Sequence, residues 1–532
     1  MQTSFLKDST TRSRVDIWRV FLLGIVLFVG SSSAKLANAT ENHTLSIAIS
    51  APVGALNPHG YGTNAMFAQN LVYEGLTKLD KSGNIIPSLA TSWDISPDGR
   101  SYTFHLRKGV RFSNGEIFDA DVVLLNFTSI LQHRERHSWV GLIHALDSVK
   151  KLDPYTIVLT LKYPYTLTLD ELAFVRPFRF LAKSAFPSDL NLTTYNPTPI
   201  GTGAYMLESS TASTITFRKN PYYKDFSSSQ SQASPPKTPY FDTIIAKIIF
   251  EPSARLAALQ ARQIDAIYGL ELVSLDMFNT ARKNPRLRTY TSAPLSTILL
   301  AINPRTKALE STFARKALVQ ALDTSALIPS VFGDLATQAT SIYAPNTALL
   351  QSVRFPKLPP HQCDMAHTPK DPIELIYPSN NPQQKMLAQI IQSQAKACGI
   401  PLRIKGIEPS AYKKHLINNT FELAFTQTWG APYEPLSHLY SMQKEGYIEY
   451  KLLQALESTR AQDFHKHTTQ AIHASTTKEL QDHLNTALSL LFDAYILFPI
   501  AHQRNAAIMR SEIKGVEMGA LVVELPIAEW YQ

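Results

Sequence analysis

Hydrophobic and polar residues alternate in several short stretches of the first half of the chain. Residues 44–49 and 155–161 alternate with a period of two, which predicts strands, and residues 244–250 form a further predicted strand. Residues 66–75 instead have helical spacing. A second helix is expected to begin after Asp119, whose side chain suits an N-cap.

Turn sequences divide the stretch between residues 76 and 110 into short apolar runs. SGN at residues 82–84 and PDG at 97–99 are typical of β-hairpins. Residues 225–239 are rich in Ser, Gln and Pro and are expected to form an exposed loop, because a strand resumes directly after them. The first half is therefore predicted to be rich in β-strands.

The pattern changes at about residue 292, where longer helices alternate with strands. Strands are predicted at residues 375–377 and 402–404. The predicted helices are residues 314–322, 386–398, 411–418 and 479–492. Strands that alternate with helices indicate an α/β domain with a mainly parallel sheet.

Two further strands are predicted close to the end of the chain, at residues 495–500 and 506–509. If they return to the first part of the fold, the chain forms two lobes joined by a hinge, with a cleft between them. Ligand sites favour such interfaces. The expected organisation is an N-terminal lobe at 40–285 with an extra β-rich subdomain, a C-terminal α/β lobe at 286–498, and a return to the first lobe at 499–532.

The N-terminus has the layout of a cleaved secretory signal. Lys7, Arg12, Arg14 and Arg19 precede the apolar run 20–29, and small residues follow up to Ala39. The apolar run is shorter than the roughly 20 residues that a membrane span needs, although an uncleaved anchor is the alternative interpretation. Residues 1–39 are therefore predicted to be a signal peptide, with an exported protein beginning at Thr40 or Glu41.

Composition narrows the possible partners. The 532-residue chain carries a net charge of +8, and loss of the five basic and two acidic side chains of residues 1–39 would leave about +5. No basic block has interleaved aromatic residues, so nucleic acid is not expected as a partner. A mild positive charge favours anionic ligands such as carboxylates.

The chain has two cysteines, Cys363 and Cys398. Export to an oxidising compartment would permit a disulfide between them, and two unrelated thiols are the alternative. Cys363 also lies close to His361 and His367, but this triplet follows a Pro-rich loop and has no second pair of ligands nearby, which argues against a metal site.

Sequence motifs for catalysis are not found. The chain has no Gly-rich phosphate loop, no HExxH pair and no GxSxG elbow, and Gly201–Gly203 is better interpreted as a turn. No carboxylate spacing indicates an acid and base pair. An exported hydrolase is the least favoured of the functions considered, and no catalytic residue is predicted.

A series of motifs follows the first predicted strand. They are VYEGL at 72–76, IPSLATSW at 86–93, DGRSYTFHLR at 98–107, FSNGE at 112–116, FDADV at 118–122, PIGTGAY at 199–205 and RKNPYY at 218–223. In order and spacing they resemble the extracellular solute-binding proteins, family 5, that feed peptide and nickel ABC transporters, and the resemblance runs over most of the chain after residue 39. The family implies an α/β fold of the two-lobed periplasmic binding protein type, a periplasmic location and no enzymatic activity.

A second set of motifs is LNPH at 56–59, MFAQ at 66–69, RERHSW at 134–139, RPFRF at 176–180 and TWGAPYEP at 428–435. Together they resemble the nickel-binding branch of this family more than its di- and oligopeptide branch. The branch implies a metal that arrives already bound by small organic acids or amino acids, so the cleft must hold an anionic complex.

The matched motifs supply the predicted ligand-binding residues. Arg136 and Arg176 would hold carboxylates, because a guanidinium binds them through two parallel hydrogen bonds and stays charged; an internal ion pair is the alternative for either. Five aromatic side chains and the soft sulfur of one methionine would complete the walls of the cleft. They belong to Trp139, Trp429, Tyr433, Tyr412, Tyr61 and Met66, and for each of them packing in the core is the alternative.

One position departs from the nickel-binding pattern. That pattern can add a histidine from the loop after the TWGAPYEP motif, and here the loop reads MQKEGY at 442–447, with Tyr447 where the histidine would fall. Imidazole is a good ligand for nickel, so direct coordination by the protein is in doubt. Three alternatives follow. The chelator occupies every coordination position of the metal, or His438 or His59 takes the place of the missing histidine, or the ligand is not nickel.

The prediction is a monomeric periplasmic receptor that binds chelated nickel as cargo, by closure of its lobes, and delivers it to the permease subunits of an ABC transporter. A di- or oligopeptide receptor on the same fold is the first alternative. It would need a carboxylate for the peptide amino terminus, which the sequence does not locate. Haem and other flat anionic ligands are a further alternative.

Overall fold

The computed structural model describes residues 43–62, 65–80, 82–225, 238–269, 272–345, 348–430, 433–474, 476–519 and 521–532. These described residues pack as one compact unit. The predicted signal peptide, the expected start of the exported protein and most of the predicted loop at 225–239 lie outside the described residues. Among the helices that are described, none is long and apolar enough to cross a membrane.

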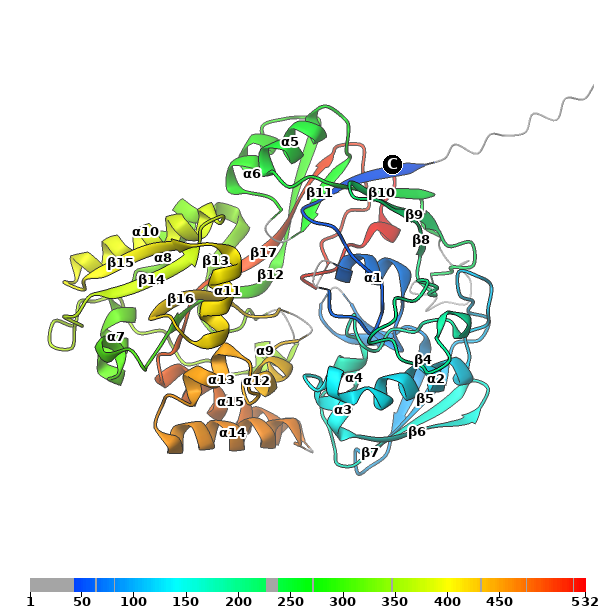
Figure 1. Ribbon diagram of the computed structural model, residues 1–532, viewed down its shortest axis with the longest axis horizontal. Helices are drawn as coiled ribbons and strands as arrows, with labels where there is room; N and C mark the ends of the chain where they lie inside the picture. Colours follow the sequence, from blue (N-terminus) through cyan, green and yellow to red (C-terminus); the bar gives the residue numbers. More distant parts are fainter. Residues whose placement is uncertain are drawn as a thin grey trace, which may run out of the picture. The chain divides into compact units, whose positions relative to one another are not determined.

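One large sheet of eleven strands runs through the fold (Figure 1). Its order is β15–β14–β16–β12–β17–β11–β1–β10–β9–β8, and β13 pairs with β17 at the side. The strands are β1 (Thr44–Ile49), β8 (Tyr205–Ser210), β9 (Thr214–Lys219), β10 (Thr243–Ile248), β11 (Ala266–Gly269), β12 (Leu287–Ile302), β13 (Ala336–Gln338), β14 (Ile373–Pro378), β15 (Leu402–Ile407), β16 (Leu423–Gln427) and β17 (Leu497–Arg510). The predicted strands near residues 44, 244, 375 and 402 are confirmed.

The long strands β12 and β17 connect the two ends of this sheet. They pair antiparallel from Leu287–Arg510 to Ala301–Leu497, with register shifts around Pro294 and Ser296. β17 also pairs with β11, whereas the far end of β12 pairs with β16. The proposed lobe boundaries fall just before β12 and inside β17, and these boundaries stay predictions.

Two smaller antiparallel sheets lie outside the large one. They confirm the predicted hairpins: β2 (Thr77–Leu79) pairs with β3 (Ile85–Pro87), and a four-stranded sheet has the order β4–β5–β7–β6. The strands of the four-stranded sheet are β4 (Ala90–Ile95), β5 (Ser101–Leu106), β6 (Leu146–Asp153) and β7 (Thr156–Leu161). Gly83 and Gly99 turn the chain at φ values of 77° and 64°, a region that favours glycine.

The helices confirm the prediction that helices alternate with strands in the second half of the chain. Those of the first half are α1 (Met66–Val72), α2 (Ala120–Gln132), α3 (Gly141–Ala145), α4 (Thr168–Leu172), α5 (Pro252–Gln260) and α6 (Leu275–Arg282). Those of the second half are α7 (Thr312–Gln320), α8 (Thr324–Val331), α9 (Ala348–Ser352), α10 (Pro382–Ala397), α11 (Pro409–Asn418), α12 (Leu436–Ser441), α13 (Ile448–Leu453), α14 (Ser458–Ile472) and α15 (Thr477–Asp493). Asp119 caps α2 as predicted, because its carboxylate accepts from the backbone N–H groups of Asp121 and Val122.

The C-terminal strands differ from the prediction. Residues 495–500 and 506–509 were expected as two strands, but one continuous strand, β17, runs from Leu497 to Arg510 and leaves out residues 495 and 496. Two polar residues in its middle are buried and hydrogen-bonded: His502 Nδ1 lies 2.9 Å from Thr297 Oγ1, and Asn505 donates to the carbonyl oxygens of Leu521 and Val522. These tertiary hydrogen bonds therefore stabilise the strand where its sequence no longer alternates between hydrophobic and polar residues.

Cys363 and Cys398 form a disulfide. The bond joins the loop before β14 to the C-terminal end of α10. Cys363 is consequently not available as a metal ligand. His361 lies 3.1 Å from the carbonyl oxygen of Gln320, and His367 pairs with Asp364, so the structure uses the other two residues of the triplet in other contacts.

A buried carboxylate ties distant segments together. Glu171, at the end of α4, is fully buried and accepts from the backbone N–H groups of Gly141 and Leu142. It also accepts from the Tyr165 hydroxyl at 2.7 Å and from the Ser437 hydroxyl at 3.2 Å. Burial raises the pKa of Glu171 to about 7, although these four hydrogen bonds oppose the rise.

We predict that removal of the disulfide destabilises the protein without changing its fold. The bond closes a loop across a sequence separation of 35. Because it restricts the unfolded chain, the Cys363→Ser, Cys398→Ser double variant should lose about 3–4 kcal/mol of unfolding free energy. Urea denaturation followed by circular dichroism measures this loss. A reducing agent should destabilise the wild type and leave the double variant unchanged; equal midpoints for the two oxidised proteins would contradict the prediction.

We predict that Glu171 makes stability depend on pH. Its native pKa is raised, so its contribution is fully present below about pH 4.5 and is lost as the pH rises through about 7. The slope is at most about 1.4 kcal/mol per pH unit. The unfolding free energy of the wild type should therefore decrease from pH 5 to pH 7. In Glu171→Gln this decrease should be about 2 kcal/mol smaller. The exposed-site control Glu208→Gln should keep the wild-type difference, and an unaltered slope in Glu171→Gln would refute the assignment.

Candidate functional site

Four loops that follow regular elements bring Tyr61, Trp139, Arg176 and the pair Trp429 and Tyr433 together. Tyr61 lies in the loop after β1, and Trp139 follows the short turn of 3₁₀ helix at Arg134–His137. Arg176 lies after α4, and Trp429 and Tyr433 follow β16. Side chains from both halves of the chain thus meet at loops held by a rigid scaffold, where binding residues are commonly found.

Trp139 is the centre of an aromatic cluster. Its ring centroid lies 5.8 Å from that of Tyr61, 6.1 Å from that of Trp429 and 6.1 Å from that of Tyr433. Phe174 stacks parallel to it at 5.9 Å with an interplanar angle of 2°. The contact between Trp139 and Trp429 joins residues from the two predicted lobes, as a cleft site requires.

The two predicted arginines converge on one ring. The guanidinium carbon of Arg176 lies 5.1 Å from the ring centroid of Tyr61, and that of Arg136 lies 5.7 Å from it. Arg176 is nearly buried and donates to the carbonyl oxygen of Gly62 at 2.9 Å. Within the described part of the chain, neither guanidinium forms an ion pair, so the internal salt bridge considered as an alternative is not found.

Burial perturbs the titrating groups of this cluster. It lowers the pKa of Arg176, while the nearby Tyr433 and Tyr61 act in the opposite direction. Burial also raises the pKa of Tyr61 and of Tyr433, and for Tyr433 the positive charge of Arg176 opposes the rise. Both tyrosines are therefore neutral hydroxyl groups close to positive charge, which suits hydrogen bonding to an anionic ligand.

Two histidines lie behind Tyr61. The Tyr61 hydroxyl and Nδ1 of His137 are 2.5 Å apart, and the rings of His59 and His137 meet edge-on at 6.0 Å. Burial, followed by the charge of Arg136, lowers the pKa of His137 to about 4. Burial also lowers the pKa of His59, whose Nε2 has no hydrogen-bond partner among the described atoms. Both imidazoles are consequently neutral at pH 7, the form that binds metals.

His438 lies beneath the cluster and is fully buried. Its ring packs 5.1 Å from Trp429, Nδ1 lies 3.1 Å from the Tyr343 hydroxyl and Nε2 lies 3.8 Å from Oε1 of Glu449. These contacts support the loop that carries Trp429. The described residues contain no group of three or more His, Cys, Asp or Glu that could hold a metal ion, so the assignments of His438 and His59 as metal ligands stay predictions.

Two aromatic residues of the cluster were not predicted as site residues. Phe174 lies two positions before Arg176, outside the motif that was matched, and Tyr447 packs 5.8 Å from Trp429. Tyr447 is the residue that stands where the nickel-binding pattern can place a histidine. An aromatic ring that packs on Trp429 thus occupies this position, and a role of Tyr447 in binding stays untested.

Met66 and Tyr412 have other surroundings. Tyr412 is buried, and its hydroxyl donates to the carbonyl oxygen of Phe425 at 2.5 Å. Met66 begins α1 and lines a cavity of about 180 Å³ together with Tyr268 and Val522. Among the described contacts, neither joins the cluster around Trp139, and their roles in binding stay predictions.

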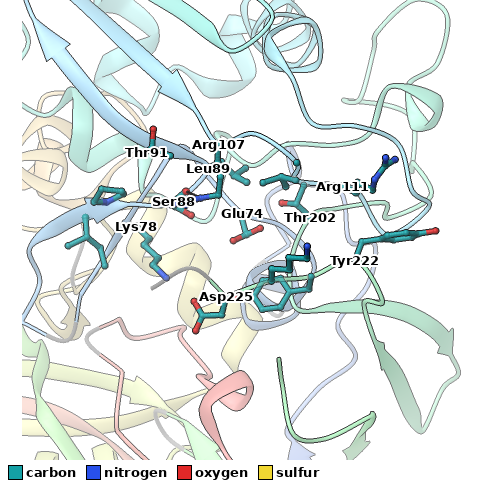
Figure 2. Close-up of a pocket in the computed structure, with 16 residues that line it drawn as sticks. Glu74, Lys78, Ser88, Leu89, Thr91, Arg107, Arg111, Thr202, Tyr222 and Asp225 are labelled. Atoms are coloured by element: carbon teal, nitrogen blue, oxygen red, sulfur yellow. Dashed lines mark hydrogen bonds between the residues drawn. The ribbon is translucent and has the colours of Figure 1, made fainter. Parts of the chain in front are cut away.

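A separate polar cavity of about 330 Å³ lies among residues 74–111 and 202–225 (Figure 2). Figure 2 shows the Glu74 carboxylate facing this cavity, with Lys78, Ser88 and Thr202 around it. Burial raises the pKa of Glu74, and the hydroxyl of Thr202 and the charge of Lys78 oppose the rise. Every residue that lines this cavity belongs to the first half of the chain, so it is not the interface at which Trp139 meets Trp429.

Comparison with known proteins identifies the family. The sequence model of the bacterial extracellular solute-binding proteins, family 5, matches residues 84–449. The nickel-binding periplasmic protein of Escherichia coli is 31% identical over 499 residues, which cover 90% of this chain and 92% of that protein. Di/tripeptide-binding protein 2 of Pseudomonas aeruginosa is 27% identical over 415 residues, which cover 71% of this chain and 74% of that protein.

A solved structure agrees with this assignment. NikA from Brucella suis, crystallised in complex with Fe(III)-EDTA, superposes with a TM-score of 0.83 at 31% identity and covers 92% of this chain and 99% of that chain. The predicted α/β, two-lobed periplasmic binding protein fold is thereby confirmed, and the relatives are solute-binding proteins and not enzymes. This chain belongs to the bacterial extracellular solute-binding proteins, family 5.

Proposed function

We propose that this protein is the periplasmic receptor of an ABC importer and that it binds nickel as an anionic complex with a small organic chelator. The observation that carries the proposal is the pair of arginines over Tyr61, which have no ion-pair partner among the described residues. Arg176 is largely buried, and a buried positive charge without a partner is costly unless a ligand supplies the negative charge. Arg136 is exposed and adds a second positive charge at the edge of the cluster. A chelate with free carboxylates meets this requirement.

The form of the aromatic cluster supports a compact, flat ligand. Trp139 and Trp429 meet at an interplanar angle of 74°, so they present two walls at an angle to each other. Rings of this kind bury a large area of ligand while losing few side-chain rotations. The arginines would then fix the orientation of the complex through its carboxylates.

The similarity to relatives supports the metal as cargo. The nickel-binding protein of Escherichia coli aligns over 90% of this chain, and the Brucella suis structure holds a metal bound by an aminocarboxylate. Here Tyr447 packs on Trp429, and the contacts of His438 are with Tyr343 and Glu449. We therefore propose that the chelator supplies the metal ligands and that the protein recognises the complex through its charge and shape.

A di- or tripeptide receptor is the second candidate, because peptide-binding relatives also align with this chain. A peptide needs a carboxylate for its ammonium group. Glu434 lies in the loop between Trp429 and α12, but burial raises its pKa to about 7, and its Oε1 accepts from the backbone N–H of Gly430. This residue supports the loop and lacks the fixed negative charge that an ammonium group requires.

We predict that binding requires metal and chelator together. Tryptophan fluorescence, which reports on Trp139 and Trp429 in the cluster, should detect tight binding of Ni²⁺ with excess free histidine and little response to Ni²⁺ alone, because the arginines need the chelator's carboxylates. Calorimetry then measures the affinity for the nickel–histidine complex. A dipeptide mixture and haemin serve as the competing ligands. Peptide binding that is indifferent to nickel would place the protein with the peptide receptors, and haemin binding alone would favour the remaining alternative.

We predict that Arg176 contributes strongly to affinity for the nickel complex. Arg176→Met should weaken binding by about 10- to 100-fold, since a hydrogen bond to a charged group contributes about 1.5–3 kcal/mol. Arg176→Lys should recover only part of this loss, because an ammonium cannot form two parallel hydrogen bonds. The exposed Arg218→Met is the matched control and should bind as the wild type does. If Arg176→Met also binds normally, the arginine pair does not hold the ligand.

We predict a smaller contribution from Trp139. Trp139→Phe should reduce affinity by about 2- to 10-fold, which corresponds to the 0.5–1.5 kcal/mol of an aromatic contact. Trp93→Phe is the matched control, because Trp93 packs against Phe104 in the β4–β5 hairpin. Titration calorimetry at one pH and ionic strength measures both variants. An equal loss in the two would show that the effect is one of general stability.

A further inference from the structure

Two histidines face each other between α14 and α15, helices that run side by side (Figure 1). Nδ1 of His467 lies 3.0 Å from Nδ1 of His483, and the ring centroids are 5.2 Å apart. Both side chains are partly exposed. Neither ring contacts the cluster around Trp139 among the described residues, so the pair is separate from the proposed ligand cleft.

The helix periodicity explains why these two side chains meet. Phe464 and Thr468 of α14 are buried, as are Leu480 and Leu484 of α15. His467 and His483 each precede a buried residue by one position, which places them at the edge of the buried stripe of their helix. The packed helices thus hold both imidazoles at the border between the interface and the solvent.

The separation of the two nitrogens fits a shared metal ion. Imidazole nitrogen binds Zn²⁺ at about 2.0–2.1 Å, and two such bonds at angles between square and tetrahedral place the nitrogens roughly 2.9–3.4 Å apart. The observed distance of 3.0 Å lies in this range. Without a metal, Nδ1 of one histidine carries the hydrogen and donates it to Nδ1 of the other. With a metal, that hydrogen would move to Nε2 of its ring, and both Nδ1 lone pairs would bind the cation.

Acidic and basic side chains both surround the pair. Asp463 lies four residues before His467 on the same face of α14 and interacts with it electrostatically, and so does Lys466. Asp482 interacts with His483 but is itself ion-paired with Lys478 at 2.5 Å. The geometry of the two imidazoles, and not the surrounding charge, therefore carries the metal site.

We propose that His467 and His483 form an accessory site for a late first-row divalent cation, Ni²⁺, Cu²⁺ or Zn²⁺. Imidazole favours these ions over Mg²⁺ and Ca²⁺, which prefer oxygen ligands. In the described part of the chain, no third His, Cys, Asp or Glu completes a metal-binding group with the pair. Water or a small ligand fills the remaining positions, so the site holds a metal that has not been fully chelated.

The test is a calorimetric titration of the purified protein with Ni²⁺ in a weakly coordinating buffer that contains no chelator. The wild type should bind one equivalent at this site, and His467→Gln and His483→Gln should each weaken that binding at least tenfold. The double variant should lose no more than either single variant, because one ion uses both rings. His465→Gln, on the same helix, is the matched control and should behave as the wild type does.

A second variant separates this site from the proposed cleft. Arg176→Met is expected to bind the nickel–chelator complex weakly, but it should still bind one equivalent of Ni²⁺ at His467 and His483. Circular dichroism should give the same helix content for all variants, so that a loss of binding is not a loss of folding. The proposal is overturned if the wild type binds no Ni²⁺ under these conditions, or if the two histidine variants bind it with wild-type affinity and stoichiometry.

Discussion

The pairing of β12 with β17 holds the other strands of the large sheet, and the loops that follow them, in place. These strands form an antiparallel ladder between Leu287 and Ala301 on one side and Arg510 and Leu497 on the other. Through β11 and β16 the ladder joins strands from the first half of the chain to strands from the second half. The C-terminal segment therefore completes a sheet that the earlier parts of the chain cannot form alone.

This ladder fixes where the loops of the candidate site can lie. Trp429 follows β16, which pairs with β12, whereas Tyr61 follows β1, which pairs with β11. Trp139 and Trp429 are distant in sequence, yet their rings lie 6.1 Å apart. The glutamate Glu171 adds a second tie between distant segments, because it accepts hydrogen bonds from Leu142 and from Ser437. A binding site assembled in this way exists only in the folded chain.

The charges of the site explain its proposed preference for anions. Arg136 and Arg176 lie over Tyr61 and have no ion-pair partner among the described residues, while His59 and His137 behind them are kept neutral by burial. Neutral histidines avoid further repulsion near the arginines. Positive charge is thus concentrated on two guanidinium groups, which suits the bidentate recognition of carboxylates.

The sequence by itself determined the local elements and the family, because period-two alternation, turn sequences and caps such as Asp119 act over short distances. Its motifs also named Arg176 and Trp139, which lie in the cluster. Tertiary contacts were needed to make residues 497–510 one strand, to stack Phe174 on Trp139, and to place the Tyr412 hydroxyl against the Phe425 carbonyl. These outcomes depend on contacts between segments far apart in the chain, which no local pattern encodes.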